Sequence, residues 1–359
     1  MVYKADTHHQ EEDSVKSMRW MAPLVVLALA GLTAAAGASA AASKPAATTT
    51  AALVSDVGKF NDRSFNQFQL EGLNRAKKQL GVAALPLQSN SVSDYIPNLA
   101  TAVRRKADLV IAAGFLLADA TNTVAKKFPN TKFAITDYPV EAPPFTDAKT
   151  KHTSPNVMGL TYQANEGGCL VGYLAALMVK QAGGKQVISA VGGLKIPPVD
   201  IWIAGYKYCA ALANPKIKVL VAYSQDFVKQ DLCKSVAENQ IAAGSKVVFQ
   251  VAGGCGLGAL NAAKEHNLWG IGVDKDQSDQ GAHILTSGVK HVDVGVFNVV
   301  KSAKDGTFKG GTDLNFDLKN NGVGVGKISP KVPAAFIAKM NALKAKIIAG
   351  TVKVPTALK

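Results

Sequence analysis

Short apolar runs alternate with longer amphipathic stretches along most of the chain. The first run, 51–54, contains no polar residue, as expected for a strand that is buried on both faces of a parallel sheet. In the following stretch, 64–80, apolar residues recur at the spacing of one helix face: Phe68, Leu70, Leu73, Ala76 and Leu80. Strand and helix patterns then alternate in units of about 25 residues, the size of a βα repeat with a right-handed crossover. The pattern therefore predicts an α/β fold with parallel sheets.

A proline-rich insertion at 139–155 separates two series of such units. Strands are predicted at 51–54, 83–88, 109–113, 132–136, 157–162, 186–191, 217–223, 246–251, 268–273 and 283–286, with a β-rich stretch at 322–327. Helices are predicted at 64–80, 95–106, 117–127, 166–180, 199–213, 232–243, 257–266, 292–303 and 334–348. The two series predict two similar parallel-sheet domains.

The composition fits a globular chain with room for two domains, since 48% of the 359 residues are hydrophobic and 18% are charged. Lysine and arginine number 40 against 26 aspartate and glutamate residues. The basic residues are scattered, with neither an arginine-rich helix nor a basic patch interleaved with aromatic rings. We therefore expect no nucleic-acid partner. We interpret the positive net charge as a property of the solvated protein surface, which favours contact with anionic surfaces of the cell envelope.

Residues 1–40 are predicted to be an N-terminal extension and a secretory signal peptide. A basic start at 18–20 precedes an apolar segment at 23–32, and the small residues 38–40 form a cleavage site. The apolar segment is short and rich in alanine and glycine, which argues against a membrane span. The stretch 41–50 holds alanine, threonine and proline and is interpreted as a linker. The mature protein is therefore expected outside the cytoplasm.

The four cysteines are expected to form disulfides, because the protein is predicted to be exported and an even number of cysteines in an oxidising compartment is typical of disulfide bonding. The four are Cys169, Cys209, Cys233 and Cys255. No CxxC pair is present, so no zinc site or other metal site is expected. The first two cysteines lie on successive predicted helices, and the last two follow successive predicted strands at the same end of a sheet. We favour the pairs Cys169–Cys209 and Cys233–Cys255, with the other two pairings and free buried thiols as alternatives.

Polar residues follow the first strand directly, in the sequence LVSDVGKFNDRSFN at 53–66. Ligands of open α/β sheets bind at the carboxyl ends of the strands. Asp56, Asn61, Asp62 and Phe65 are therefore predicted to lie at the mouth of a crevice.

This stretch resembles the signature of the basic membrane protein family, the nucleoside-binding receptors of ABC importers. The matching pieces are VSDVG at 54–58 and NDRSFN at 61–66. Six further motifs follow in the family's order: AAGFLLADA at 112–120, FAITD at 133–137, GGLKIP at 192–197, FQVAGGCGLG at 249–258, IGVDKDQ at 271–277 and LTSGVK at 285–290. Leu194 stands where the family has Met, and Cys255 stands where it has Thr. The resemblance covers roughly residues 50–305.

The resemblance implies the type I periplasmic-binding-protein fold, in which two parallel-sheet domains are joined by a hinge. Domain 1 is expected to comprise 51–161 and 284–310, and domain 2 to comprise 162–283 and 311–359. The implied function is that of an extracytoplasmic receptor, which closes on a purine nucleoside in the interdomain cleft and delivers it to an ABC permease. The protein is expected to act as a monomer.

Family members are often lipoproteins, which need a cysteine at the cleavage site. No cysteine precedes Cys169, so a released periplasmic or secreted protein is expected. The alternative function is that of an exported small-molecule sensor or signalling receptor on the same fold. A neighbouring permease and ATPase would favour the importer, and a neighbouring histidine kinase would favour the sensor.

A purine nucleoside presents two flat apolar faces, which aromatic rings can cover. Phe65 is the candidate for one face and Trp202 for the other, at a position where family members carry a Phe. The alternative for Trp202 is ordinary packing of its helix. Phe115 belongs to the matching Gly-Phe motif and is included among the candidate ligand-binding residues.

Carboxylates are suitable partners for the ribose hydroxyl groups, because hydroxyl groups can donate hydrogen bonds. Asp274 is the first candidate, with Lys290 bound to the same sugar and balancing the charge. Gly253 and Gly254 would let main-chain amides approach the ligand, because neither carries a Cβ. Three further residues are expected to contact base or ribose edges: Asp56, Asn61 and Asp137. Each Asp has a competing structural role as a helix cap.

Enzymatic patterns do not fit the sequence. No HExxH pair and no Gly-x-Ser-x-Gly motif occurs, and the six histidines are dispersed. The glycines at 254–258 do not complete a dinucleotide fingerprint, and those at 322–327 lack P-loop spacing. We therefore expect a binding protein without enzymatic activity or cofactor, and a nucleoside hydrolase is the weakest of the alternatives.

Overall fold

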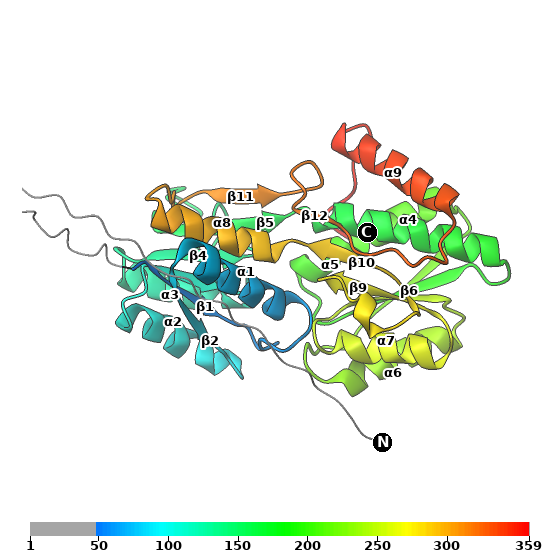
Figure 1. Cartoon of the computed structure of the whole chain (residues 1–359), viewed down its shortest axis with the longest axis horizontal. Coiled ribbons are helices and arrows are strands. Elements are labelled where there is room, and N and C mark those ends of the chain that lie inside the picture. The colour runs from blue at the N-terminus through cyan, green and yellow to red at the C-terminus, as the bar shows by residue number, and fades with distance from the viewer. Residues whose placement is uncertain (1–47, 359) are drawn as a thin grey trace, which may run out of the picture. The chain divides into compact units, whose positions relative to one another are not determined.

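The computed structural model describes residues 48–358. The predicted signal segment, 1–40, and most of the predicted linker, 41–50, lie outside the described residues. The described chain is built on two six-stranded sheets, each covered by helices on both faces (Figure 1).

The first sheet has the strand order β11-β5-β4-β3-β1-β2, and every neighbouring pair in it is parallel. Its strands in chain order are β1 (Thr50–Val54), β2 (Ala83–Leu87), β3 (Leu109–Ala112), β4 (Lys132–Thr136), β5 (Val157–Tyr162) and β11 (Asp313–Phe316). In β1, Ala51 and Leu53 belong to one buried cluster, while Ala52 and Val54 belong to another. Both faces of this strand are thus buried, which explains its uninterrupted apolar sequence.

The second sheet has the strand order β12-β10-β9-β8-β6-β7. Its strands in chain order are β6 (Val187–Gly192), β7 (Lys218–Tyr223), β8 (Val247–Val251), β9 (Trp269–Asp274), β10 (Ile284–Lys290) and β12 (Val323–Val325). Only β12 runs antiparallel to its neighbour in this sheet. The predicted α/β class with parallel sheets is therefore confirmed.

The helices form layers on each sheet. The first sheet carries α1 (Phe65–Leu80), α2 (Tyr95–Arg104), α3 (Ala118–Lys127) and α8 (Val292–Lys304). The second sheet carries α4 (Ala164–Ala182), α5 (Pro197–Ala213), α6 (Gln230–Ala242), α7 (Gly256–Glu265) and α9 (Ala334–Ile348), the last lying on α4 (Figure 1). We call the first sheet with its four helices the first lobe, and the second sheet with its five helices the second lobe.

The chain passes between the lobes three times, after β5, after β10 and between β11 and β12. This differs from the expected domain segments at two strands. The segment Ile284–Lys290, expected in domain 1, pairs with β9 in the second sheet, and Asp313–Phe316, expected in domain 2, pairs with β5 in the first. The apolar sequence of a strand does not specify its neighbour, so these assignments were wrong. The residues Ala47–Lys359 cluster as one compact unit, and the division into two domains stays a prediction.

Both favoured disulfides are present. Cys169–Cys209 joins α4 to α5 with a Cα–Cα distance of 4.9 Å. Cys233–Cys255 joins α6 to the residue before α7 with a Cα–Cα distance of 5.6 Å. All four cysteines are fully buried, so both bridges lie inside the second lobe.

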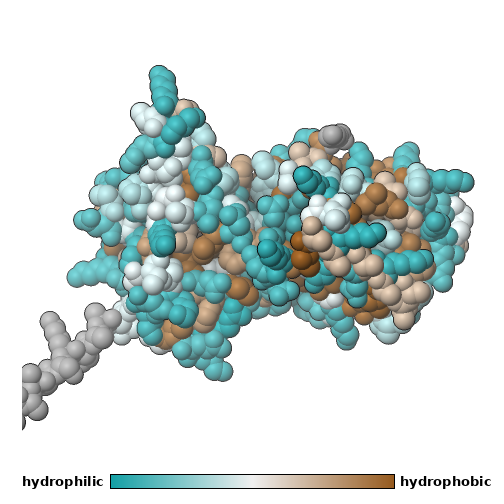
Figure 2. All heavy atoms as spheres, turned by 90° about the horizontal axis from the view of Figure 1, so that it is seen from above, coloured by the Kyte–Doolittle hydropathy of each residue, from teal (hydrophilic) through white to brown (hydrophobic). Residues whose placement is uncertain are grey.

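On the face shown in Figure 2, hydrophilic residues predominate and apolar residues are visible in separate patches. Among residues 48–358, no helix has the length and apolar character needed to cross a membrane.

Candidate functional site

The site begins where β1 ends. Asp56 is 8% exposed, and its Oδ1 accepts hydrogen bonds from the main-chain N–H of Gly58 at 2.8 Å and from Asn66 Nδ2 at 2.7 Å. The side-chain oxygen of Asn66 in turn accepts from the main-chain N–H of Asp56 at 3.2 Å. This reciprocal pair fixes Oδ1 toward α1, and both residues line a pocket between the two lobes.

Asp62 shapes the start of α1. Its carboxylate accepts main-chain hydrogen bonds from Ser64 at 2.9 Å, Asn66 at 2.8 Å and Gln67 at 3.0 Å. Unpaired N–H groups at the beginning of a helix need such acceptors. The cap turns the first residue of the helix, Phe65, toward the pocket.

A buried charge cluster from both lobes forms another part of the lining. Lys290, at the end of β10, is 2% exposed, and its Nζ lies 2.6 Å from Asp137 Oδ2 and 3.4 Å from Asp274 Oδ1. Asp137 follows β4 in the first lobe, whereas Asp274 ends β9 in the second. Both aspartates have a positive φ, 62° and 64°, a conformation that non-glycine residues adopt rarely and often at functional sites.

The hydrogen bonding of Asp274 is incomplete. Its Oδ2 accepts from Ser64 Oγ at 3.3 Å, whereas its buried Oδ1 receives no hydrogen bond from the described residues and has only the 3.4 Å ion pair with Lys290. A buried carboxylate oxygen without a donor is costly, and bound ligands commonly supply the missing donor. The pocket that Asp274 lines is the space from which such a donor would reach it.

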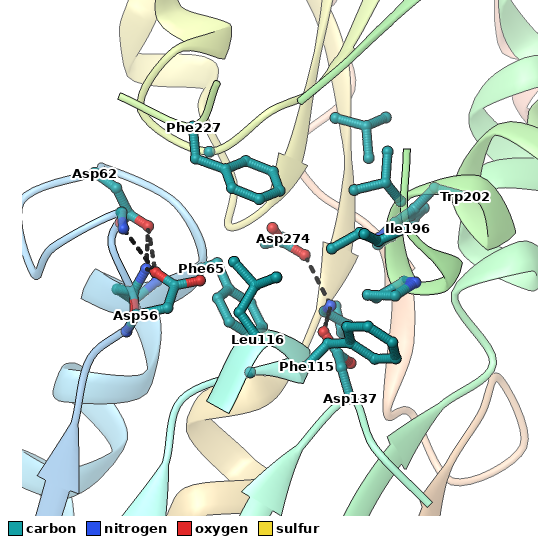
Figure 3. Close-up of a pocket in the computed structure, with 18 residues that line it drawn as sticks. Asp56, Asp62, Phe65, Phe115, Leu116, Asp137, Ile196, Trp202, Phe227 and Asp274 are labelled. Carbon is teal, nitrogen blue, oxygen red and sulfur yellow. Dashed lines mark hydrogen bonds and ion pairs between the residues drawn. The ribbon is translucent and has the colours of Figure 1, made fainter. Parts of the chain in front are cut away.

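Aromatic rings form the apolar walls. Phe65, on α1 of the first lobe, and Phe227, in the β7–α6 loop of the second lobe, project into the same space (Figure 3). The Nζ of Lys290 lies 4.6 Å from the centroid of the Phe65 ring, a cation–π distance that links the charge cluster to this wall. Phe115 also lines the pocket and stacks on Tyr138 at a ring-centroid distance of 5.0 Å.

Trp202 lines the pocket but is only 1% exposed. Its ring makes an edge-on contact with Phe249 at 6.2 Å between centroids. A Cβ at Gly167 would lie 2.8 Å from the Trp202 ring, and one at Gly288 would lie 2.6 Å from it. The ring therefore fills a slot made by two glycines, and packing accounts for most of its surface.

Burial alters the protonation of the site carboxylates. Burial raises the pKa of Asp56 from 3.8 to about 7, against the lowering effect of the hydrogen bonds from Asn66 and Gly58. Burial also raises the pKa of Asp62. For Lys290, burial lowers the pKa, but the charges of Asp137 and Asp274 outweigh that effect and raise it overall. The lysine is therefore held in its charged form between the two aspartates.

Glycines let the walls come together at two points. Gly114 has a φ of 118°, and a Cβ there would lie 3.0 Å from the Phe65 ring and 3.6 Å from Asp56 Oδ2. Gly253 has a φ of 54° and lines the pocket from the β8–α7 loop. In both cases the missing side chain leaves the main chain beside the pocket.

Eight of the ten residues predicted to bind a ligand line this one pocket: Asp56, Phe65, Phe115, Asp137, Trp202, Gly253, Asp274 and Lys290. The other two, Asn61 and Gly254, are not among its lining residues; Asn61 is exposed, and Gly254 is buried between the main chain of Phe227 and Asp62. Sequence reasoning did not assign a ligand to several further lining residues: Gly58, Asp62, Asn66, Gly114, Leu116, Ile196, Pro198, Val199, Phe227 and Val251. Most lie within or next to the quoted motifs, whereas Phe227 lies in a loop for which no motif was noted.

Polar contacts join the lobes around the pocket. Ser64 Oγ donates to the carbonyl of Val273 at 3.1 Å, and Gln277 Nε2 donates to the carbonyl of Arg63 at 3.1 Å. Outside these lie two ion pairs, Arg63–Asp279 at 2.9 Å and Lys275–Glu71 at 2.5 Å. The lobes are thus in contact at the beginning of α1.

The arrangement suits binding better than bond cleavage. Within the described part of the chain, no group of three or more His, Cys, Asp or Glu side chains is arranged to hold a metal ion. The pocket offers aromatic walls, buried carboxylate acceptors and one fixed cation. A small molecule with a flat apolar part and several hydrogen-bond donors is the ligand that fits these groups.

A family model described as "ABC transporter substrate-binding protein PnrA-like", named Bmp, matches residues 49–357. The chain belongs to this family. This Bmp-family protein is 34% identical over 328 residues to the "CD4+ T-cell-stimulating antigen" of Listeria monocytogenes, a match that covers 85% of this chain and 88% of the relative. It is also 34% identical over 332 residues to a Lactococcus lactis subsp. cremoris protein named "ABC transporter nucleoside-binding protein BmpA", covering 85% of this chain and 89% of the relative.

A solved structure of an ABC transporter system solute-binding protein from Aeropyrum pernix K1 is similar to this Bmp-family protein, with a TM-score of 0.76 and 27% identity. The match covers 87% of this chain and 94% of the solved chain. These findings confirm the predicted family and the periplasmic-binding-protein type of fold. Family membership also confirms a non-enzymatic substrate-binding role, with a small-molecule ligand and a permease as partners.

Proposed function

We propose that this Bmp-family protein binds a purine nucleoside between its lobes and delivers it to the permease of an ABC importer. The observation that carries the proposal is Asp274 Oδ1, which is buried in a pocket with aromatic walls and has, among the described residues, only a long ion pair with Lys290 Nζ at 3.4 Å. A nucleoside has both groups that this site lacks, namely hydroxyl donors and a flat apolar base.

The base would lie between Phe65 and Phe227. Their rings come from opposite lobes and project into the same pocket (Figure 3), so closure would bring one ring onto each face of a flat ligand. This modifies the sequence-based proposal for the second face. We assign that face to Phe227 and give Trp202 a supporting role, because the Trp202 ring is almost entirely covered by protein.

The ribose would lie at the charge cluster. Asp274 would accept a hydroxyl hydrogen, and Lys290 would donate to a sugar oxygen while it neutralises the neighbouring carboxylates. Because Asp137 and Asp274 share one ammonium group, a phosphate placed here would meet excess negative charge. The cluster therefore favours a nucleoside over a nucleotide.

The base edge would face Asp56. With a pKa raised to about 7 by burial, this carboxyl group is available at neutral pH both as a hydrogen-bond donor and as an acceptor. Purine edges carry acceptor nitrogens and N–H donors, and either kind of group finds a partner there. Asn61 and Gly254 receive no ligand contact in this proposal, since neither lines the pocket.

The comparisons support the same substrate class, because one relative that matches most of the chain is named as a nucleoside-binding protein. Release into the periplasm or medium and a monomeric state are parts of the same proposal. Size-exclusion chromatography of the secreted protein tests the second.

A thermal-shift panel on residues 41–359 tests the ligand class. It would include adenosine, guanosine, inosine, cytidine, uridine, free bases, common sugars and amino acids. A ligand at about a thousand times its dissociation constant stabilises a protein by roughly 4 kcal/mol, which gives a clear rise in melting temperature. A rise confined to purine nucleosides is expected. A response only to another class would keep the fold and reject the proposed substrate.

Replacement of Asp274 tests the ribose contact. Asp274→Ala should weaken nucleoside binding at least about tenfold, because it removes a charge-assisted partner from buried hydroxyl groups. Asp305→Ala is the control, since it removes the same charge at the C-terminal end of α8. Isothermal titration calorimetry measures the nucleoside affinity of both variants, and equal affinities would exclude Asp274 from the site.

A further inference from the structure

The loop that carries Phe227, residues 224–229, is shaped by hydrogen bonds of its own. Asp226 Oδ1 accepts from the main-chain N–H groups of Val228 and Lys229 at 2.6 and 2.7 Å. At its start, the main-chain N–H groups of Ser224 and Gln225 donate to the carbonyls of Gly192 and Gly193 at 2.9 and 3.1 Å. At its end, Val228 and Lys229 are exposed. The Phe227 ring itself is only half-buried. The bonds within the loop set its shape, so the position of the ring also depends on what ties the loop to the segment before α7.

The middle of the loop is fixed by Cys255. The main-chain N–H of Cys255 donates to the carbonyl of Phe227 at 2.9 Å. Cys255 Sγ lies 2.9 Å from the carbonyl oxygen of Lys229, and 3.4 Å from Ser224 Oγ. Ser224 Oγ also lies 3.3 Å from Cys233 Sγ. Both sulfurs of one disulfide thus lie against the loop.

The same disulfide holds together the two segments that form this part of the pocket. Cys233 is the fourth residue of α6, the helix that follows the loop 224–229, and Cys255 directly follows the glycines at 253–254. Gly253 lines the pocket, and a Cβ at Gly254 would lie 3.4 Å from the carbonyl of Phe227. The bridge therefore joins the segment before α7 to the helix that follows the Phe227 loop.

Packing around the bridge would not replace it. The buried cluster beneath α6 and α7 consists mainly of small side chains, including Ala237, Ala252, Ala259, Ala262 and Ala263. Such side chains bury little apolar area, so they hold the two helices together less firmly than larger ones would. A covalent link at this place restricts the motion of the loop more than the local packing can.

We propose that Cys233–Cys255 is a positioning element of the ligand pocket, which holds Phe227 in place through Cys255 and thereby raises affinity for the ligand. The inference rests on the proposed function, because it assigns Phe227 to one face of a purine base. It differs from ordinary stabilisation, since the second bridge, Cys169–Cys209, lies in the same lobe but joins α4 to α5 away from this loop.

The experiment compares two double variants, C233A/C255A and the control C169A/C209A. Isothermal titration with adenosine, guanosine and inosine should show a threefold to tenfold loss of affinity for C233A/C255A, the cost of ordering one side chain and its loop on binding. The control should bind within about twofold of the unaltered protein. Equal affinity of C233A/C255A and the unaltered protein would overturn the proposal. If C233A/C255A lacks native circular dichroism, C233A/C255T replaces it.

A double-mutant cycle separates positioning from stability. F227A alone should weaken binding, and removal of the bridge from F227A should cause no further loss, because the ring that the bridge positions is then absent. A full additional loss in the F227A background would show that the bridge acts elsewhere and would overturn the proposal.

Hydrogen exchange of the ligand-free proteins makes the outcome independent of the substrate. Compared with the unaltered protein, main-chain amides at 224–229 should exchange faster in C233A/C255A and at the same rate in C169A/C209A. If the unaltered protein binds no purine nucleoside, the proposed function fails while this result still decides whether the bridge holds the loop. Unchanged exchange at 224–229 would reject the positioning role.

Discussion

Asp56 shows how burial changes the chemistry of one side chain. Its hydrogen bonds from Gly58 and Asn66 favour the ionised form, but removal from water opposes ionisation more strongly, so the pKa rises to about 7. In the unfolded chain the same group titrates near 3.8. The native state therefore binds the extra proton between these two pH values, and its stability falls as the pH rises through the native pKa.

Asp56→Asn should remove this dependence on pH. The amide oxygen can still accept from Gly58 and Asn66, and no charge is buried, so the ligand-free variant should be more stable than the unaltered protein by about 2 to 4 kcal/mol at pH 8. At pH 4 the difference should nearly vanish. Urea unfolding at several pH values measures it, and parallel stability curves for the two proteins would contradict the assigned pKa.

At the scale of elements, the start of α1 brings the site together. One short motif gives the helix its cap through Asp62, orients Asp56 through Asn66, turns Phe65 into the pocket and contacts the second lobe through Ser64. Neighbouring residues thus make different contacts, because successive side chains at the start of a helix point in different directions. The exposed Asn61 lies just outside this set.

Asp62→Ala should destabilise the protein by about 1 to 2 kcal/mol, because the first N–H groups of α1 lose their acceptor. Asp119→Ala is a matched control, since Asp119 lies in the first turn of α3 and its exposed side chain accepts no hydrogen bond from a described residue. Asp119→Ala should lower the free energy of unfolding by less than about 1 kcal/mol, which is what one charge near a helix end contributes. Urea unfolding measures the stability of both variants, and equal losses of stability would show that Asp62 does not cap α1.

At the scale of the whole described chain, the ion pairs Arg63–Asp279 and Lys275–Glu71 join α1 and the residues just before it to the segment after β9. They lie beside the buried contacts of Ser64 and Gln277 with the opposite lobe. Arg63 and Asp279 have side chains that are 53% and 59% exposed, so salt should weaken their attraction. These ion pairs would favour contact between the two lobes without deciding which ligand is bound.

Arg63→Ala combined with Glu71→Ala should weaken ligand binding about twofold to fivefold, because exposed ion pairs contribute little each. The loss should shrink at high salt, and small-angle scattering should show a larger radius of gyration for the ligand-free variant. Lys301→Ala combined with Asp305→Ala is the control, since it also removes one positive and one negative charge, from an ion pair at the C-terminal end of α8. An equal effect of the control would indicate that the loss of any surface ion pair, and not the loss of contact between the lobes, is responsible.

Much of this architecture follows from local sequence. Alternating apolar runs and helical periodicity predicted the strands and helices, because both patterns report which side of a segment is buried. The end of β1 with its motif placed Asp56 and Phe65 at the pocket, since the carboxyl ends of parallel strands meet at one edge of a sheet. The order of the cysteines along successive elements predicted both disulfides.

Contacts between distant segments decided the rest. The strand β10 joined the second sheet and the strand β11 the first, because hydrogen bonding to a neighbour, which apolar sequence does not encode, determines sheet membership. Phe227 projects into the pocket from a loop, while Trp202 is covered by its neighbours, because side-chain exposure depends on the surrounding elements. The sequence by itself determined the elements, the family and most of the site; only the tertiary structure decided which side chains from the two lobes meet, since that depends on packing across the whole chain.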